Sequence, residues 1–539
     1  MHGCKHKSEM DHCQHIVSGS SLNCQHIVSP VAEEYWQHVA HLPFYSKLEL
    51  REEDWGSTVP ITWHTDGVRI YKSQKAWVYS FAPAVRKGRS LDTKMLTLLF
   101  REHDMTKPGT HDDVGLFIAW CMEVLRSGLY PSTDMNGKPW PRQSREAKMA
   151  GKQFAGGWKC AFAAFKADLE ARVLVHKLVR NWSSYSICEH CLASRKPGSP
   201  FTFGDFTENA LYLEHFFTHS EFLILNPPDK QSSWVHVRGW DKDRNLDEPG
   251  PSRDMLHVVH QGVGQHAVAS LISHHYEDLF RGSLTLGVLE RLLQTDAWPH
   301  YKSWCRDHKE MASSSMPFNL PRFNRESWKS YPELGSCYKA ACVKTFIFWC
   351  AAFLRENMDC KDPSSCLRAD AAYSLAHFQH LQDLHGAWLT SDVAEAMSAA
   401  GRNFLILYQA LACQSRHAGQ HLYHIVPKFH CLLHLVLRLP IEKRNPAFDH
   451  LYQEEDYMKE IGKIASRTHA RTMDTVTLLR SAVKLGAVPS ESVWVMIFTV
   501  DDADRYVVLY AFDLMYVQVL VCTLLMALYL LLDKSFDAL

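Results

Sequence analysis

The run KCAFAAFKADLEARVLVHKLVRNWSSYSICEHC, residues 159–191, carries the features from which we predict the fold. Cys160 to Phe165 are small and apolar, without Pro or Gly, which predicts a short buried strand. Apolar residues then recur at helical spacing over about Leu169 to Val179. Asp168 stands between the two elements, at the strand end where the active sites of α/β proteins open.

Basic residues are concentrated in and around this run, although the whole chain of 539 residues has a net charge of only −1. Between Lys138 and Lys196 there are 12 Lys or Arg against four acids. A near-neutral total does not exclude nucleic-acid binding, because the local concentration of positive charge matters more than the sum. A lone acid at Asp168 in such surroundings indicates a carboxylate that holds metal ions beside a polyanion.

The composition is that of a folded chain, with 46% hydrophobic and 22% charged residues. Its length allows about two to four domains. Sixteen Cys are scattered along it and the N-terminus has no apolar signal-peptide core, which together predict a reducing compartment with thiols available to metal. A count of 32 His makes zinc worth considering.

Hydrophobic patterns divide the chain into five regions. The chain begins its folded part with three β-rich runs and a helical run, and the strand and helix of the opening stretch follow. The resulting order, β-β-β-α-β-α, is that of a ribonuclease-H-like core. We therefore predict an α/β fold: a ribonuclease-H-like mixed sheet with a large all-helical insertion and an apolar C-terminal helix. Residues 1–54 are predicted to be a flexible Cys/His-containing tail in which CQHIVS occurs twice, and residues 55–253 the first part of the core with a zinc knuckle. Residues 254–440 are the helical insertion, and residues 441–490 contain the final catalytic helix, predicted as one long helix over 453–485. Residues 491–539 are an apolar tail.

The tail has two interpretations. Residues 514–532 form a 19-residue run interrupted only by Gln518 and Thr523, long enough to cross a bilayer as a tail anchor. The other interpretation is a terminal helix that is buried or poorly ordered.

Three carboxylates are candidates for two-metal chemistry, which needs hard oxygen ligands from separate elements. Asp66 begins an Asp-Gly step, which is also a common hairpin turn. Asp168 is also suited to cap a helix. Glu455 heads a helix with basic residues at four-residue steps, and its alternative is a solvated face with a Glu455–Lys459 pair. Glu454 competes with Glu455 for the third position.

Cys188 and Cys191 form a Cys-x-x-Cys knuckle, which is half of a zinc site. The sequence leaves several sources open for the remaining ligands, and His430 and His434 lie at i, i+4 on one helix face. The candidates are Asp254 and His257, His260, or His430 and His434.

At these residues the chain resembles cut-and-paste DNA transposases of the CACTA/Plavaka type, in the DDE superfamily. The similarity covers roughly residues 55 to 485, and it rests on the order and number of short motifs. The first motif is Asp66-Gly67. The second is a D-x-P-A-R-like segment from Asp168 to Arg172, in which Glu170 replaces the Pro and Asp168 precedes Cys188 by twenty residues. The last two are the D-x-x-H of Asp254 and His257 and the E-x-Y-M of Glu455 to Met458.

The resemblance implies a catalytic core in which Asp66, Asp168 and Glu455 hold two Mg²⁺ (or Mn²⁺) ions. Water would cleave one phosphodiester and the freed 3′-hydroxyl would attack target DNA. It also implies a structural Zn²⁺ at the knuckle, with Asp254 and His257 among the metal ligands, DNA as partner, a homo-oligomer and a nuclear location.

Two departures from the family, an N-terminal region without a DNA-binding domain and the apolar C-terminus, leave other functions open. The chain could be an inactive copy. It could be a non-catalytic, zinc-containing DNA- or protein-binding protein, or a tail-anchored membrane protein.

Overall fold

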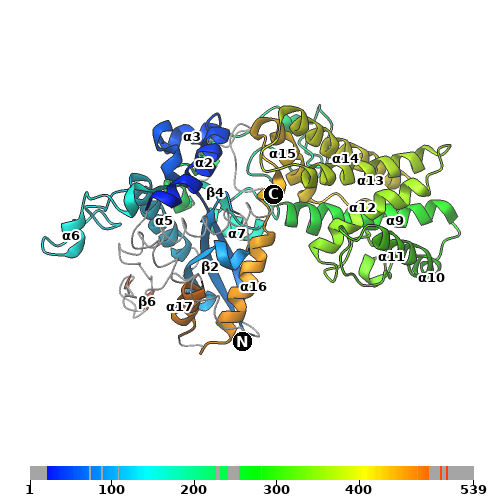
Figure 1. Cartoon of the computed structure of the whole chain (residues 1–539). Helices are drawn as coiled ribbons and strands as arrows, with labels where there is room; N and C mark the ends of the chain where they lie inside the picture. Colours follow the sequence, from blue (N-terminus) through cyan, green and yellow to red (C-terminus); the bar gives the residue numbers. More distant parts are fainter. Residues whose placement is uncertain are drawn as a thin grey trace.

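The computed structural model shows a mixed α/β protein in which a four-stranded sheet lies beside a large helical block (Figure 1). The predicted mixed α/β class is therefore confirmed. The residues that the structure describes are 21–71, 74–86, 89–106, 109–225, 231–240, 254–280, 282–469, 472–484, 498–499 and 506–507.

The sheet has the strand order β3-β2-β1-β4, so β1 is a central strand. β1 pairs antiparallel with β2, β2 pairs antiparallel with β3, and β4 runs parallel to β1. The three β-rich runs of the sequence thus form an antiparallel meander. The strands are β1 (Thr58–Arg69), β2 (Lys75–Pro83), β3 (Met95–Arg101) and β4 (Lys159–Lys166).

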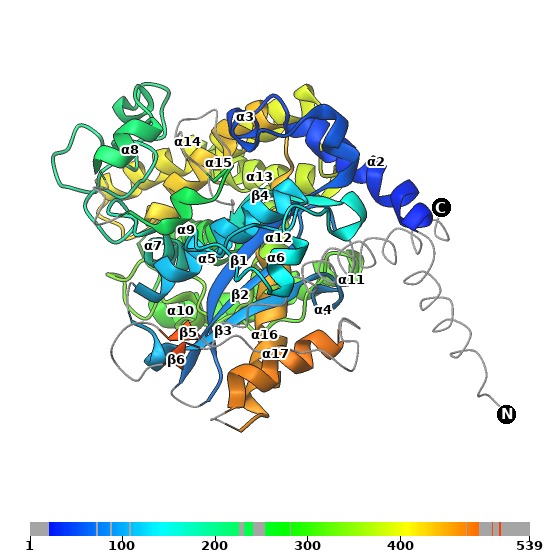
Figure 2. The same cartoon turned by 90° about the vertical axis from the view of Figure 1, so that its left-hand side faces the viewer.

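Alternating side chains of the strands face two different layers. On one face, Trp63 and Phe81 join a core with residues of α5 (Gly109–Ser127). On the other face, residues such as Val78 join a core with α16 (Tyr452–Ser466) and α17 (Met473–Lys484). Figure 2 shows α16 and α17 lying across this second face. The main elements of the sheet layer follow one another as β1, β2, β3, α5, β4 and α7 (Leu169–His176).

The single long helix predicted over 453–485 is wrong, because the structure has two helices, α16 and α17, separated by residues 467–472. Gly462 lies in α16 where the helix crosses β1. A Cβ atom there would lie 3.0 Å from Cγ2 of Val68, so the absent side chain allows α16 to approach the strand closely.

The flexible tail predicted for residues 1–54 is also wrong for the described part of that range. α2 (Ser21–Val39) and α3 (Pro43–Leu48) precede β1, and the Trp36 side chain is fully buried. Trp36 donates its indole N–H to the carbonyl of Thr58 at 2.6 Å, which ties α2 to the start of β1. The apolar residues of these helices pack on β4, a surface that the sequence pattern did not reveal.

The helical block lies between the knuckle segment and α16, and all the elements assigned there within the described residues are helical. They share one extended core that also contains Cys188 and Cys191. The longer ones are η7 (Leu256–Val263), α9 (Gly264–Phe280), α10 (Leu286–Leu292), η8 (Leu293–Ala297), α11 (Trp298–Asp307), α12 (Ala340–Glu356), α13 (Pro363–Leu384), α14 (Ser391–His417) and α15 (Pro427–Glu442), and two short 3-10 turns, η9 (Pro321–Phe323) and η10 (Pro446–Phe448), accompany them.

The apolar run over 514–532 lies outside the described residues. Among the helices that are described, none combines the length and the hydropathy needed to span a bilayer.

Candidate functional site

Asp66 lies within β1, near the strand's C-terminal end. Asp66 and Gly67 are paired with Val78 and Trp77 of β2, so the interpretation of this Asp-Gly step as a hairpin turn is wrong. The Asp66 carboxylate accepts a hydrogen bond from the backbone N–H of Gly67 at 2.6 Å. Strand pairing thus presents this acid on the α16 side of the sheet.

Asp168 lies at the same end of the sheet as Asp66. The parallel ladder between β1 and β4 ends with the pair His64 and Lys166, and each acid follows its strand's last pair by two residues. Asp168 is also the N-cap of α7, where its Oδ1 accepts a hydrogen bond from Ala171 N at 2.6 Å. The capping role and a place at this edge are therefore compatible.

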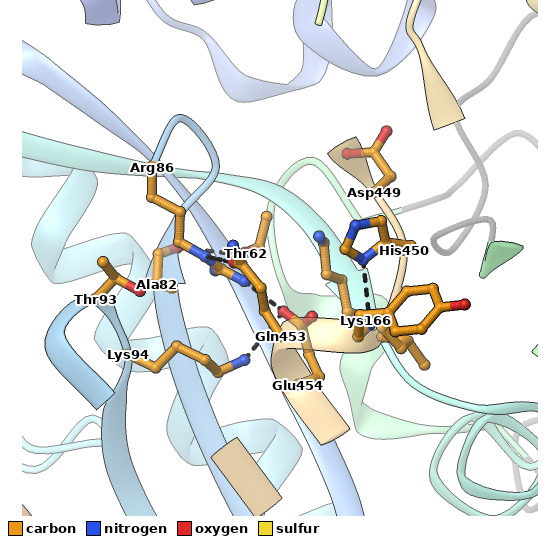
Figure 3. Close-up of polar contacts among 12 residues, drawn as sticks. Thr62, Ala82, Arg86, Thr93, Lys94, Lys166, Asp449, His450, Gln453 and Glu454 are labelled. Atoms are coloured by element: carbon orange, nitrogen blue, oxygen red, sulfur yellow. Dashed lines mark hydrogen bonds and ion pairs between the residues drawn. The ribbon is translucent and has the colours of Figure 1, made fainter. Parts of the chain in front are cut away.

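Glu454 and Glu455, both in the first turn of α16, face different surroundings. Glu454 is 1% exposed and its Oε1 accepts hydrogen bonds from Arg86 at 2.6 Å and from Lys94 at 3.0 Å (Figure 3). Glu455 is 45% exposed, and its Oε1 lies 3.5 Å from Nε2 of His257. Glu455, not its neighbour, is therefore the acid that faces His257.

We call Glu454 with Arg86, Lys94 and Lys166 the Glu454 cluster. Burial alone would raise the pKa of Glu454, but the charges of Lys94, Lys166 and Arg86 hold it well below its usual value. Burial lowers the pKa of Lys94 to about 7, and Glu454 offsets only part of that shift. The cluster joins the first turn of α16 to the strand ends beneath it, so it is a structural feature of the interior.

Two of the three predicted carboxylates, Asp66 and Glu455, have raised pKa values. Burial raises the pKa of Asp66 to about 7, with further contributions from the negative charges of Asp168 and Glu455. The pKa of Glu455 is raised as well, first by burial and then by acids that include Asp168, although the nearby His257 opposes the shift. Mutual repulsion of this kind requires that the three acids lie near one another, and a bound cation would relieve it.

His257 is held in place by Asp254. Nδ1 of His257 contacts Oδ2 of Asp254, and the same carboxylate caps η7 by accepting the backbone N–H groups of Leu256 at 3.0 Å and of His257 at 3.2 Å. Asp254 also accepts from Leu451 N at 3.2 Å, immediately before α16. Burial lowers the pKa of His257, but the hydrogen bond to Asp254 and the surrounding acids outweigh it, so the net shift is upward.

A compact group of four potential metal ligands is buried beside this region. Cys188 Sγ lies 3.3 Å from Nε2 of His434, and Cys191 Sγ lies 3.3 Å from Nε2 of His430. The two imidazole Nε2 atoms are 3.0 Å apart, and all four ligand atoms lie within 4.8 Å of one another. Tetrahedral zinc ligands, at about 2.0–2.3 Å from the ion, lie about 3.3–3.8 Å from each other, so the group could hold zinc.

The sequence left the partners of the knuckle open, and the structure brings His430 and His434 to Cys188 and Cys191. Asp254 and His257 are outside this group and contact each other instead, so their assignment to the knuckle is corrected. His260 is also elsewhere, because its Nε2 contacts Gln379 and its Nδ1 contacts Tyr452. The useful signal in the sequence was the i, i+4 spacing of the two histidines on α15.

The knuckle joins the segment after α7 to α15, which belongs to the helical block. Arg180 donates to the carbonyls of Cys188 and Cys191, each at 2.8 Å, which orients the knuckle backbone. A cavity of about 70 Å³ lies against the Cys2His2 group and also reaches Asp254 and His257. The group therefore adjoins the acidic site from the side of the helical block.

The carboxylates are arranged more loosely than the Cys2His2 group. Within the described residues, the Cys2His2 set is the single group of three or more potential ligands whose atoms all lie within 4.8 Å. Asp66, Asp168 and Glu455 thus do not form a closed three-carboxylate cage around one ion. Their charges interact across a looser arrangement, to which a strand, a helix cap and a distant helix each contribute one acid.

A comparison with protein-family models gives no match, and neither does a comparison with curated proteins. The evidence on function is therefore the geometry of these residues.

Proposed function

We propose that the chain belongs to the transposase-like nucleases that cleave and join DNA strands by a two-metal mechanism, as an active enzyme or an inactive copy. The observation that carries the proposal is the approach of Asp66, Asp168 and Glu455: burial raises the pKa of Asp66 to about 7, and the negative charges of Asp168 and Glu455 add to that shift. DNA as partner, a homo-oligomeric state and a nuclear location follow from this proposal.

The sheet supports a ribonuclease-H-like core as part of the same proposal. Three antiparallel strands in chain order are followed by a helix and then by β4, which lies beside β1 and parallel to it. This arrangement brings the ends of β1 and β4 to one edge, where Asp66 and Asp168 lie. The third acid arrives on α16, after the whole helical block.

The donor set suits hard divalent cations, because carboxylate oxygens are the ligands that Mg²⁺ and Mn²⁺ prefer. Two such ions would supply Lewis-acid stabilisation of the attacking and the leaving oxygen. A pair of ions about 3.5–4 Å apart needs ligands spread over a wider site than one ion does, so the absence of a closed cage around one ion does not count against two ions. In this proposal Asp66, Asp168 and Glu455 are the ligands.

Asp254 and His257 have a supporting role in the proposal. Asp254 holds Nδ1 of His257, so Nε2 is directed at Glu455 and can orient that carboxylate or hold a proton beside it. With zinc bound, the Cys2His2 group would fix the position of the helical block relative to the segment that follows Asp168. Zinc there is structural, because all four positions are filled by protein ligands.

The test is nicking of supercoiled DNA by the purified full chain with Mg²⁺ or Mn²⁺. Asp66→Asn, Asp168→Asn and Glu455→Gln should each lower the rate by on the order of 100-fold or more, equivalent to about 3 kcal/mol of lost transition-state stabilisation. Glu170→Gln and Asp456→Asn are matched controls, since both acids are exposed neighbours of the predicted ligands. Metal-dependent nicking that survives the first three substitutions would contradict the assignment.

A second candidate is a non-catalytic zinc-containing protein that binds DNA or another protein. The compactness of the Cys2His2 group, against the looser acidic site, is the observation that favours it. It predicts stoichiometric zinc and DNA binding that is unaffected by the three carboxylate substitutions, with no metal-dependent nicking by the wild-type chain.

A further inference from the structure

An arm formed by residues 129–157 projects from the sheet layer between α5 and β4. Figure 1 shows its short helix α6 (Arg145–Met149) at the outer end of this extension, on the side away from the helical block. Figure 2, seen from that side, shows α6 in front of the sheet. The arm is thus a separate, accessible surface.

The arm is an ordered structure. At its base, Tyr130 N donates to Lys152 O at 2.9 Å and Gly151 N donates to Tyr130 O at 2.9 Å. The ring of Tyr130 lies 5.5 Å from that of Phe154, and both are buried in the core beneath α5. Farther out, the Trp140 indole donates to Pro131 O at 2.9 Å, which links the two sides of the arm.

The arm is strongly basic. It contains five Lys or Arg and two acids, for a net charge of +3 in 29 residues, in a chain whose total is −1. One of the acids, Asp134, is used locally, because its Oδ1 accepts the backbone N–H groups of Asn136 and Lys138. The basic residues are Lys138, Arg142, Arg145, Lys148 and Lys152, and all five are exposed.

Four of these cations have no acidic partner in the described part of the chain. No ion pair there involves Lys138, Arg142, Lys148 or Lys152. Elsewhere in the sheet layer, by contrast, basic residues such as Lys159 and Lys177 are paired with Asp54 and Asp112. A projecting, ordered surface of unpaired positive charge is typical of phosphate-backbone binding.

We propose that the arm, through Lys138, Arg142, Lys148 and Lys152, binds the phosphate backbone of duplex DNA outside the acidic site. The choice of duplex DNA among polyanions rests on the proposed strand-cleaving function. The base of the arm lies next to the start of β4, and Asp168 lies beyond the other end of that strand. The eight-residue length of β4, about 26 Å, therefore separates the base of the arm from Asp168. That distance corresponds to about eight base pairs, so the arm contacts DNA that flanks the cleaved position.

The experiment measures equilibrium binding of a 30-base-pair duplex by fluorescence anisotropy between 50 and 300 mM salt, about the range over which phosphate contacts are lost. No divalent metal is added, so binding is separated from cleavage. The arm variant replaces Lys138, Arg142, Lys148 and Lys152 with Gln. The control variant replaces Arg306, Lys309, Lys329 and Lys361, which are exposed in the helical block, so both variants lose one Arg and three Lys.

The arm variant should bind duplex DNA on the order of tenfold or more weakly than wild type near 0.1 M salt. The slope of log K against log salt should also be smaller in magnitude, by up to about 3.6 if four phosphate contacts are lost. The control variant should stay within about twofold of wild type. A third variant, with Lys138, Lys148 and Lys152 replaced by Arg, keeps the charge and should retain wild-type binding, and the Gln variant should unfold at the wild-type Tm, so that lost charge and not misfolding accounts for weaker binding.

Equal weakening of the arm and control variants would overturn the proposal. So would tighter binding of a single-stranded RNA or of phosphatidylserine vesicles than of duplex DNA, if the arm variant lost that binding. Nicking is measured separately, with Mn²⁺ added. A failure of the cleavage proposal therefore shows in the nicking assay, and a failure of the arm proposal shows in the binding curves.

Discussion

The adjacent glutamates of α16 provide the sharpest test of the site, because one substitution should damage the fold and the other the chemistry. Glutamine has nearly the shape of glutamate without its charge. We therefore compare Glu454→Gln with Glu455→Gln, in the same helical turn of the same protein.

The environments of the two residues give the expected magnitudes. Glu454 is 1% exposed and its partners Lys94 and Arg86 are 1% and 6% exposed, so the substitution leaves buried cations without their anion. Removing one member of a buried ion pair costs about 3–5 kcal/mol. In a cooperative unit of about 150–250 residues this lowers the Tm by roughly 6–20 °C. Glu455 is 45% exposed and is repelled by neighbouring acids, so its neutralisation should change stability by no more than about 0.5 kcal/mol.

The assay combines thermal unfolding at pH 7.5, without divalent metal, with nicking in the presence of Mn²⁺. Glu455→Gln should keep the wild-type Tm and lose metal-dependent nicking. Glu454→Gln should show the large fall in Tm. Adding Lys94→Met to Glu454→Gln should restore part of the lost stability, because it removes one of the unpaired cations.

The reasoning is refuted if Glu454→Gln unfolds at the wild-type temperature, or if Glu455→Gln is destabilised equally. Either result would mean that α16 is rotated relative to the sheet. Glu454 would then be the candidate for the third ligand.

Three further predictions concern zinc, pH and packing. The purified chain should contain one zinc per molecule by elemental analysis, and Cys191→Ser should lose it, whereas Cys413→Ser, at an exposed free cysteine, should not. The pKa of Asp66 rises from 3.8 to about 7 on folding, so the ionised carboxylate opposes folding. The resulting loss of folding free energy is absent below about pH 4 and complete above about pH 7. Asp66→Asn should therefore raise the Tm relative to wild type at pH 8, and the gain should disappear towards pH 4. In urea unfolding, Gly462→Ala should lower the free energy of unfolding by about 1 kcal/mol or more, because crowding against β1 outweighs the gain in helix propensity. Gly287→Ala is the control: the space around it is open, so the substitution should be neutral or stabilising.

Local patterns predicted much of the sheet layer. The strand and helix around Asp168 were predictable because short apolar runs, helical spacing and an acidic N-cap act within a few residues. The Cys-x-x-Cys knuckle was visible for the same reason. The helices of residues 21–54 were missed, because their apolar residues pack on β4, more than 100 positions away in the chain.

The sequence by itself determined which residues could act: three separated acids, a cysteine pair and several candidate histidines. Only the tertiary structure decided which of them meet. The Asp-Gly step at Asp66 has turn propensity, but pairing with β2 keeps it in a strand. Glu454 and Glu455 are equivalent in composition, and buried contacts with Arg86 and Lys94 turn one inward and leave the other facing His257. The physical reason is that ion pairing, strand register and metal coordination join residues hundreds of positions apart, and local propensity contains no information about such partners.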